Sequence, residues 1–163
     1  MLSMNISVLE PGEGRSVWVV GDRYTIKASG EDTDGAFALI EAVVPPQGGP
    51  PPHRHHREDE AFYVLEGELE FHSDGRRILA PAGAWAILPR GSLHYFRNVG
   101  PSPARMLTLI VPAGFEKFLL EVGREASSFS PEAGAMRPGD IEKILAVAPR
   151  YAIDFMPSES SSA

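Results

Sequence analysis

Cysteine is missing from the 163 residues of this chain. Disulfides, thiolate metal sites and thiol nucleophiles are therefore excluded, and strong metal ligands must be histidine, aspartate or glutamate. Long apolar runs are missing as well. A transmembrane helix needs about 18 consecutive apolar residues, and no segment of the sequence has them. The N-terminal residues lack the basic and apolar regions of a signal peptide. We expect a cytoplasmic protein with no membrane partner.

Basic residues are fewer than acidic ones. The chain has 15 Lys and Arg against 22 Asp and Glu, a formal net charge of −7 and a pI near 5.2. No cluster of Lys or Arg follows a helix or loop, so nucleic acid is not expected as a partner. Hydrophobic residues make up 43%, close to the globular norm, and the length suits one folded domain.

Helical periodicity is missing from residues 16–111. This span reads instead as seven to nine short strands separated by turn residues, a pattern typical of an all-β sandwich or barrel. Asp74-Gly75 lies between two strand-like runs and indicates a type I′ hairpin, and Gly21-Asp22 is read as an ordinary turn. The predicted fold is a double-sheet jelly roll.

The pattern changes after residue 111. Phe115, Phe118, Leu119 and Val122 share one face at helical spacing, which predicts a first helix. A second helix is predicted after Gly139, with an apolar face formed by Ile141, Ile144, Leu145 and Ala148. We therefore divide the chain into an N-terminal segment (1–15), a β-barrel (16–111), a helical cover of the same domain (112–156) and a flexible tail (157–163).

Three of the five histidines lie in the stretch PPHRHHREDE, residues 51–60. In a strand, side chains two residues apart point to the same face, so His53 and His55 face together and His56 faces away. Glu60 begins the next apolar strand. His94 follows a turn on a later strand, and two sheets folded over one another can bring it opposite the others. Imidazole and carboxylate together suit a divalent transition metal.

The spacing of these residues resembles the two motifs of the cupin superfamily. His53-x-His55-x(4)-Glu60-x(6)-Gly67 is similar to the first motif, whose leading glycine would fall at Gln47, beside Gly48 and Gly49. The second is matched by Gly83-x(5)-Pro89-x-Gly91-x(2)-His94-x(3)-Asn98. The fifteen-residue spacer between Gly67 and Gly83, and the chain as a whole, resemble small bacterial single-domain cupins of the quercetin 2,3-dioxygenase-like kind.

The resemblance implies a cupin barrel with one divalent transition-metal ion per chain: Fe, Mn, Ni, Co or Zn. Its ligands would be His53, His55, Glu60 and His94, whereas Asn98 would be structural. Glu60 has a second implied role as a catalytic base toward a phenol or enol. Cupins commonly form homodimers through their N-terminal strands, so a homodimer is also expected.

Apolar strand residues near these ligands are candidates for a substrate pocket. Phe62 and Val64 share the face of Glu60, and Phe96 shares that of His94. Further candidates are Trp85, Ile87 and Tyr95. The polar neighbours of the ligands are expected to be solvated: His56, Arg57, Glu58 and Asp59. His72, near a hairpin tip, is expected to be solvated as well.

The leading functional hypothesis is a metal-dependent dioxygenase acting on a small aromatic or enolisable substrate. One alternative is a metal-dependent isomerase or another non-redox enzyme acting on a small hydroxy-carbonyl compound. Another is a non-catalytic cupin that binds a small molecule. All three have a small molecule as partner, and the fold alone does not choose among them.

Overall fold

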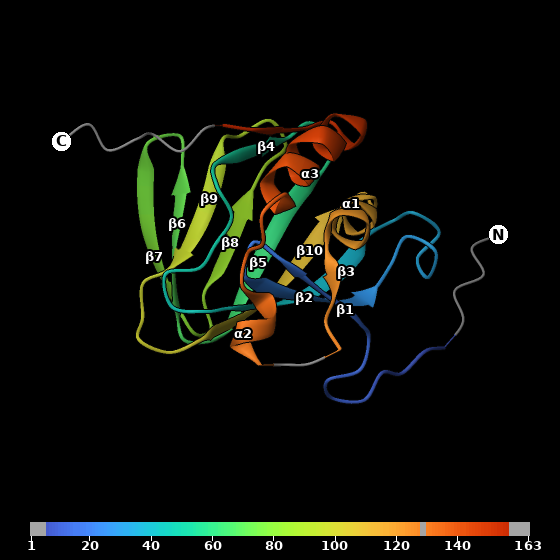
Figure 1. Cartoon of the computed structure of the whole chain (residues 1–163), viewed down its shortest axis with the longest axis horizontal. Coiled ribbons are helices and arrows are strands. Elements are labelled where there is room, and N and C mark those ends of the chain that lie inside the picture. The colour runs from blue at the N-terminus through green and yellow to red at the C-terminus, as the bar shows by residue number, and fades with distance from the viewer. Residues whose placement is uncertain (1–5, 128–129, 157–163) are drawn as a thin grey trace.

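Two antiparallel sheets face each other and form the jelly roll predicted from the sequence (Figure 1). The computed structural model describes residues 6–127 and 130–156; the tail predicted for 157–163 lies outside them. In spatial order, the seven-stranded sheet contains β11 (Arg124–Glu125), β1 (Arg15–Val19), β2 (Asp22–Ala28), β3 (Ala38–Val44), β10 (Ala104–Val111), β5 (Asp59–Glu66) and β8 (Trp85–Leu88). The five-stranded sheet contains β12 (Ile153–Phe155), β4 (His53–His55), β9 (His94–Asn98), β6 (Glu68–Ser73) and β7 (Arg76–Pro81).

Strand alternation produces the core between the sheets. Along β3 and β10 every second residue is buried, as expected for strands that present one face to the interior. The rings of Phe62, Phe71 and Phe96 meet across the two sheets with centroids 5.2–6.1 Å apart. Burial of these aromatic side chains supplies much of the apolar area that stabilises the sandwich.

The turns agree with the sequence at one hairpin and differ at another. Asp74 and Gly75 both have positive φ, 48° and 78°, as the type I′ prediction requires. Between β1 and β2, however, the positive-φ residues are Val20 and Gly21. The turn is therefore one residue earlier than predicted, and Asp22 begins strand β2 as a buried residue.

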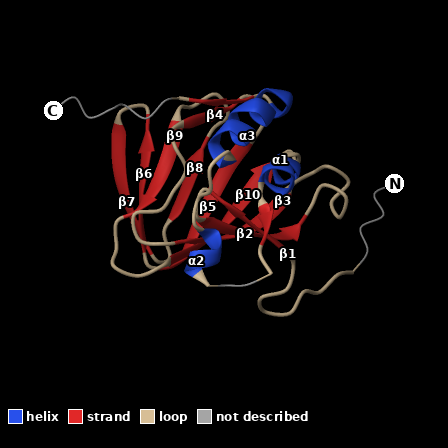
Figure 2. Ribbon diagram, in the orientation of Figure 1, coloured by secondary structure: helices blue, strands red, loops and turns tan. Residues whose placement is uncertain are grey.

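The two longer helices lie side by side next to the sheets, and a short third helix lies apart from them (Figure 2). Both predicted helices are present, as α1 (Phe115–Val122) and α3 (Asp140–Val147), with two short additions, α2 (Pro131–Gly134) and η1 (Ala148–Tyr151). The buried face of α3 is formed by Ile144 and Val147, whereas Leu145 is 51% exposed, so the predicted face is displaced around the helix. Within the described part of the chain, no helix has the length and apolarity needed to cross a bilayer.

Strands β11 and β12 were not predicted, because segments of two or three residues carry too little alternation to be recognised. β12 pairs with β4, placing Phe155 opposite His53. The span 112–156 therefore contains the helices and also adds one strand to each sheet. This places the C-terminal part of the fold directly beside the histidine-rich strand.

The loop before the histidines is held close to β9. Asn98 is fully buried, and its side-chain amide donates to the carbonyls of Val44 and Ser102 at 2.9 and 2.8 Å, while its oxygen accepts from the Gly100 N–H. Gln47, where the first motif has glycine, adopts a φ of 62°. At Gly49 a Cβ would lie 2.0 Å from the Phe96 carbonyl oxygen, so glycine is required there by close approach.

Replacement of Asn98 by Ala should destabilise the fold by about 2–4 kcal/mol, because three hydrogen bonds are lost in a buried site and their backbone partners are left without them. Urea unfolding followed by circular dichroism measures this change. Arg97→Ala, an exposed neighbour on the same strand, should alter stability by less than about 0.5 kcal/mol. Equal effects of the two substitutions would contradict the structural role assigned to Asn98.

Candidate metal centre

Four predicted ligands meet between the two sheets. His53 and His55 come from β4, His94 from β9 and Glu60 from β5, and one ligand atom of each lies within 4.8 Å of all the others. All four residues are buried. Two ligands on opposite sides of a transition metal are separated by about 4.2 Å, so the cluster is close to the size of a metal coordination sphere.

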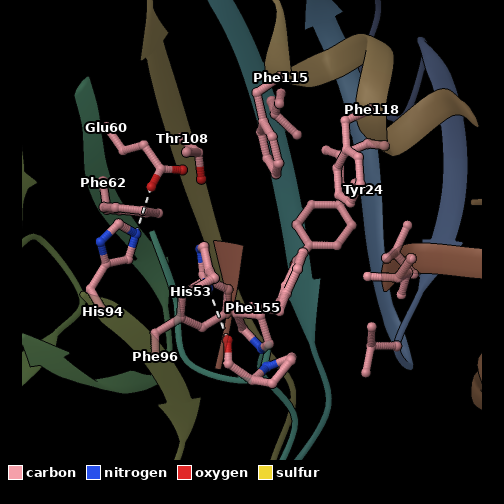
Figure 3. A pocket seen from close by; sticks show the side chains of 17 residues that line it. Tyr24, His53, Glu60, Phe62, His94, Phe96, Thr108, Phe115, Phe118 and Phe155 are labelled. Carbon is pink, nitrogen blue, oxygen red and sulfur yellow. Dashed lines mark hydrogen bonds and ion pairs between the residues drawn. The ribbon is translucent and has the colours of Figure 1, made fainter. Parts of the chain in front are cut away.

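Local structure explains why these side chains converge. Pro50, Pro51 and Pro52 favour extended backbone before β4, so His53 and His55 enter the sheet with the same parity. The register of β4 and β9 places His53 directly opposite His94. Glu60 arrives from the other sheet, and its Oε2 lies 2.7 Å from His94 Nε2 (Figure 3).

Backbone carbonyls orient two of the rings. His53 Nδ1 donates to the Pro51 carbonyl at 2.9 Å, and His94 Nδ1 lies 3.1 Å from the Ser92 carbonyl. Because a carbonyl can only accept, these contacts favour a hydrogen on Nδ1 of each ring. The Nε2 atom of each ring is then available as a ligand, which is the arrangement usual for metal-bound histidines.

His55 shows that the cluster fits a metal ion. The residue is fully buried, and neither of its ring nitrogens has a hydrogen-bond partner among the described residues. Its Nε2 lies 3.4 Å from Glu60 Oε2, and its Nδ1 lies 3.4 Å from Glu58 Oε2. An unsatisfied buried polar atom costs about 1–3 kcal/mol, a cost that a metal ion on Nε2 would remove.

Glu58 was predicted to be solvated, and this prediction is wrong. The chain bends at His56 and Arg57, and the alternation of β4 does not continue through the bend, so Glu58 is buried beside His55. Asp59 does face solvent and forms an ion pair with Arg90 at 2.8 Å. His56 is exposed as expected and contacts Asp154.

The cluster is electrostatically coupled. Burial alone would raise the pKa of Glu60, but the neighbouring His55, His94 and His53 lower it to about 2. Burial, together with His55 and His94, lowers the pKa of His53 to about 3. Burial opposes the charged form of His55, yet Glu60 and Glu58 outweigh this effect and raise its pKa. The carboxylate is therefore ionised at neutral pH, as a ligand or base must be.

A cavity of about 50 Å³ adjoins the cluster. Phe62 and Phe96, two of the candidate pocket residues, line this cavity, whereas Val64 is buried in the core and is not among the lining residues. Val64 shares the inward face of Phe62 but lies two residues further along β5. The alternation along a strand shows which face a residue is on, but not how far along the barrel interior it lies. Trp85 and Ile87 point outward and are 55% and 61% exposed.

Several residues around the cavity were missed. The ring of Phe115 lies 4.6 Å from that of His55. The ring of Phe155 on β12 lies 5.6 Å from that of His53, and Figure 3 shows both phenylalanines at the cavity. Tyr24 and Thr108 also line the cavity. Thr108 could have been found, since it is a polar residue between Met106 and Ile110 on the inward face of a strand.

Comparisons with known proteins identify the family of this chain. Residues 40–110 match the family model described as Cupin domain. Polyketide synthase CurC from Streptomyces cyaneus is 33% identical over 134 residues, which cover 81% of this chain and 83% of that protein. The chain belongs to the cupin superfamily. Quercetin 2,3-dioxygenase from Bacillus subtilis (strain 168) is 30% identical over 132 residues, 80% of this chain. The match covers 39% of that larger protein.

Solved structures show the same cupin fold. A protein described as a predicted oxalate decarboxylase from Thermotoga maritima superposes with a TM-score of 0.61 at 23% identity, covering 65% of this chain and 99% of that one. The polyketide cyclase RemF from Streptomyces resistomycificus gives 0.58 at 23% identity, with coverages of 66% and 80%. These likenesses establish the architecture of this cupin.

Asp22, read as a turn residue in the sequence, is instead a buried carboxyl group near the cavity wall. Its Oδ2 accepts a hydrogen bond from the Tyr24 hydroxyl at 3.2 Å, and no partner is present for Oδ1 among the described residues. Burial raises the pKa of Asp22 to about 8, although the contacts with Tyr24 and the Gly49 N–H act in the opposite direction. The carboxyl group is therefore protonated at neutral pH.

This shift predicts a pH dependence of stability. Between pH 4 and 8 folded Asp22 holds a proton that the unfolded chain has released, so its contribution to stability falls as pH rises through this window. Asp22→Asn, which cannot titrate, should lose less stability than wild type over that range in urea unfolding experiments. Asp34→Asn, an exposed turn control, should retain the wild-type slope. An unchanged slope in Asp22→Asn would contradict the assignment.

Proposed function

We propose that this cupin is a metal-dependent enzyme acting on a small aromatic or enolisable molecule, with dioxygenase activity as the leading function. One divalent transition-metal ion per chain would be held by His53, His55, His94 and Glu60. The observation that carries the proposal is the position of Glu60, which belongs to the four-residue cluster and also lines the aromatic cavity. A substrate in that cavity would therefore meet the carboxylate directly.

Each residue has a distinct part in this proposal. A bound metal ion would supply Lewis acidity toward a substrate oxygen. Glu60 would accept the proton of the phenol or enol at one of its carboxylate oxygens, while the carbonyl contacts of His53 and His94 hold their rings in place. Phe62, Phe96 and the neighbouring rings would bind an apolar ring system and keep water away from the deprotonated substrate.

The cavity also limits the substrate. Its volume of about 50 Å³ is far below the about 300–1,000 Å³ of pockets that enclose drug-sized ligands. A flavonol requires displacement of the cover formed by Phe115 and Phe155, whereas a small β-diketone requires much less. We therefore expect activity to favour compact enolisable compounds over quercetin.

A polyketide-directed reaction is the second candidate. Its support is the 33% identity with polyketide synthase CurC, since this match extends over most of both proteins. Ring closure of a polyketide also begins with removal of a proton beside a carbonyl group, so the same Glu60 carboxylate would serve as the base. Oxygen consumption distinguishes the two candidates, because ring closure does not use O₂.

Glu58 should tune metal affinity through His55. A carboxylate beside the outer ring nitrogen fixes the orientation of a metal-bound histidine, and loss of such a partner usually weakens binding by about 10–100-fold. Glu58→Gln should show this loss in calorimetric titration of the metal-free protein with Co²⁺. Asp59→Asn, the exposed neighbour, should bind like wild type. Equal affinity of Glu58→Gln and wild type would remove Glu58 from the metal centre.

The dioxygenase proposal is tested by oxygen uptake with metal-loaded protein, using acetylacetone and quercetin as probes. Elemental analysis of the same preparation should find close to one transition-metal ion per chain. Glu60→Gln should lower the rate of oxygen uptake by about 10²-fold or more, and reduce metal occupancy much less, if Glu60 acts as a base. Equal losses of activity and metal would make Glu60 a ligand alone.

Glu66→Gln, at the solvent-exposed end of the same strand, is the matched control and should retain full oxygen uptake. Failure to bind Co²⁺ or Ni²⁺ would refute the metal centre itself. Metal binding without oxygen uptake, combined with conversion of a polyketide-like substrate, would replace the leading function by the second candidate.

A further inference from the structure

Val20 occupies a turn position that is costly for its residue type. The turn between β1 and β2 consists of Val20 and Gly21, with φ of 53° and 86°, and Val19 pairs with Asp22 on either side of it. Positive φ at both central residues is the type I′ arrangement, which favours Asn, Asp or Gly at the first of them. A β-branched residue at positive φ is an outlier, because its Cβ crowds the following carbonyl. Val20 is therefore held in a strained conformation.

Val20 differs in kind from the other residues with positive φ. Five described residues other than glycine have positive φ: Val20, Asp34, Gln47, Asp74 and Ala152. Only Val20 among them has a branched Cβ. Asp74 begins another type I′ turn and is of a residue type that this turn prefers. Residues held in rare conformations tend to gather at ligand sites, where the strain serves a function. The Val20 side chain must therefore offer something that Asn, Asp or Gly would not.

Val20 lines the cavity beside the candidate metal centre. It is half-buried, as are Pro50 and Pro51, which line the same cavity from the loop before β4. Half-buried lining residues mark the part of a cavity wall that reaches the surface. The turn and the loop adjoin each other, because Asp22, which follows the turn, contacts the Gly49 N–H. We call Val20, Pro50 and Pro51 the entrance wall.

The entrance wall is apolar. None of its three side chains can donate or accept a hydrogen bond. A charged group that passes it loses water and gains no polar partner in return, which is unfavourable. The entrance wall therefore favours molecules that are uncharged when they enter. An enolisable diketone is uncharged until a base removes its proton, whereas a sugar phosphate or a carboxylate carries its charge from the start.

The shape of Val20 also limits size. Its two γ-methyl groups are attached through a stiff χ1 torsion, so the side chain cannot easily turn aside. The cavity behind it has a volume of only about 50 Å³. Glycine at this position would remove the branched side chain and the backbone strain together. Valine thus destabilises the turn and at the same time narrows the way into the cavity.

We propose that Val20 determines the specificity of the cavity: together with Pro50 and Pro51 it admits compact, uncharged molecules and excludes larger or charged ones. The inference rests on the proposed function for its substrate class, a small enolisable diketone that loses its proton only at Glu60. Stability and selectivity then depend on Val20 in opposite directions, because one side chain strains the turn and restricts the cavity. Such a loss of stability in favour of function is common at binding sites.

The test measures binding rather than turnover, by calorimetric titration of the full chain with and without Co²⁺. Wild type should bind acetylacetone about tenfold or more tightly than benzoylacetone, which is larger, and acetoacetate, which is charged. Val20→Gly should reduce the discrimination against benzoylacetone by about tenfold. Asp74→Gly, the same substitution at the same position of another type I′ turn, should keep the wild-type ratio, since Asp74 does not line the cavity.

Val20→Asn gives a second readout that needs neither metal nor substrate. Asn is preferred at this turn position, so the urea midpoint of this variant should equal or exceed that of wild type. Its amide can also hydrogen-bond a carboxylate, so discrimination against acetoacetate should fall. Circular dichroism must show native spectra for all variants, so that altered binding is not loss of folding.

Three results would overturn the proposal. A midpoint of Val20→Asn below that of wild type would show that valine is present for packing. An unchanged ratio of affinities in Val20→Gly would show that valine does not select, and a wild type that binds none of the three probes would remove the entrance itself. Selective binding without oxygen uptake would instead support the role of Val20 and refute only the dioxygenase function.

Discussion

The register between β4 and β9 is the constraint on which the candidate metal centre depends. Because His53 lies opposite His94, two imidazoles from segments about forty residues apart share one point in the five-stranded sheet. A shift by one residue would turn His53 and His55 to the outer face together. The register is held from outside the site: Asn98 and the Gln47–Gly49 loop fix the end of β9, and β12 pairs with the free side of β4.

Glu60 is the one carboxylate in a cluster that otherwise contains three imidazoles. The three imidazoles come from β4 and β9 of one sheet, while the carboxylate comes from β5 of the opposite sheet. Backbone carbonyls orient the rings of His53 and His94, and both rings line the cavity together with the Glu60 carboxylate.

The four candidate ligands converge as local spacing predicts, because that spacing depends on rules that act over a few residues. The i, i+2 parity of His53 and His55, the turn before His94 and the Asp74-Gly75 hairpin all follow from backbone geometry. Glu58 was misplaced because a two-residue bend interrupts that parity. Val64 was misplaced because parity does not give depth. Phe115 and Phe155 depend on contacts between segments distant in the sequence, and such packing has no local signal.

The position of Phe155 has a consequence for how the protein is made. All four ligands lie within the first 94 residues of the chain, whereas the aromatic rings that cover them come from residues 115 and 155. During synthesis from the N-terminus, the ligand strands therefore emerge well before their cover. Among the described strands β12 is the last in the sequence, so the side of β4 that it pairs with has no partner strand until β12 has been made.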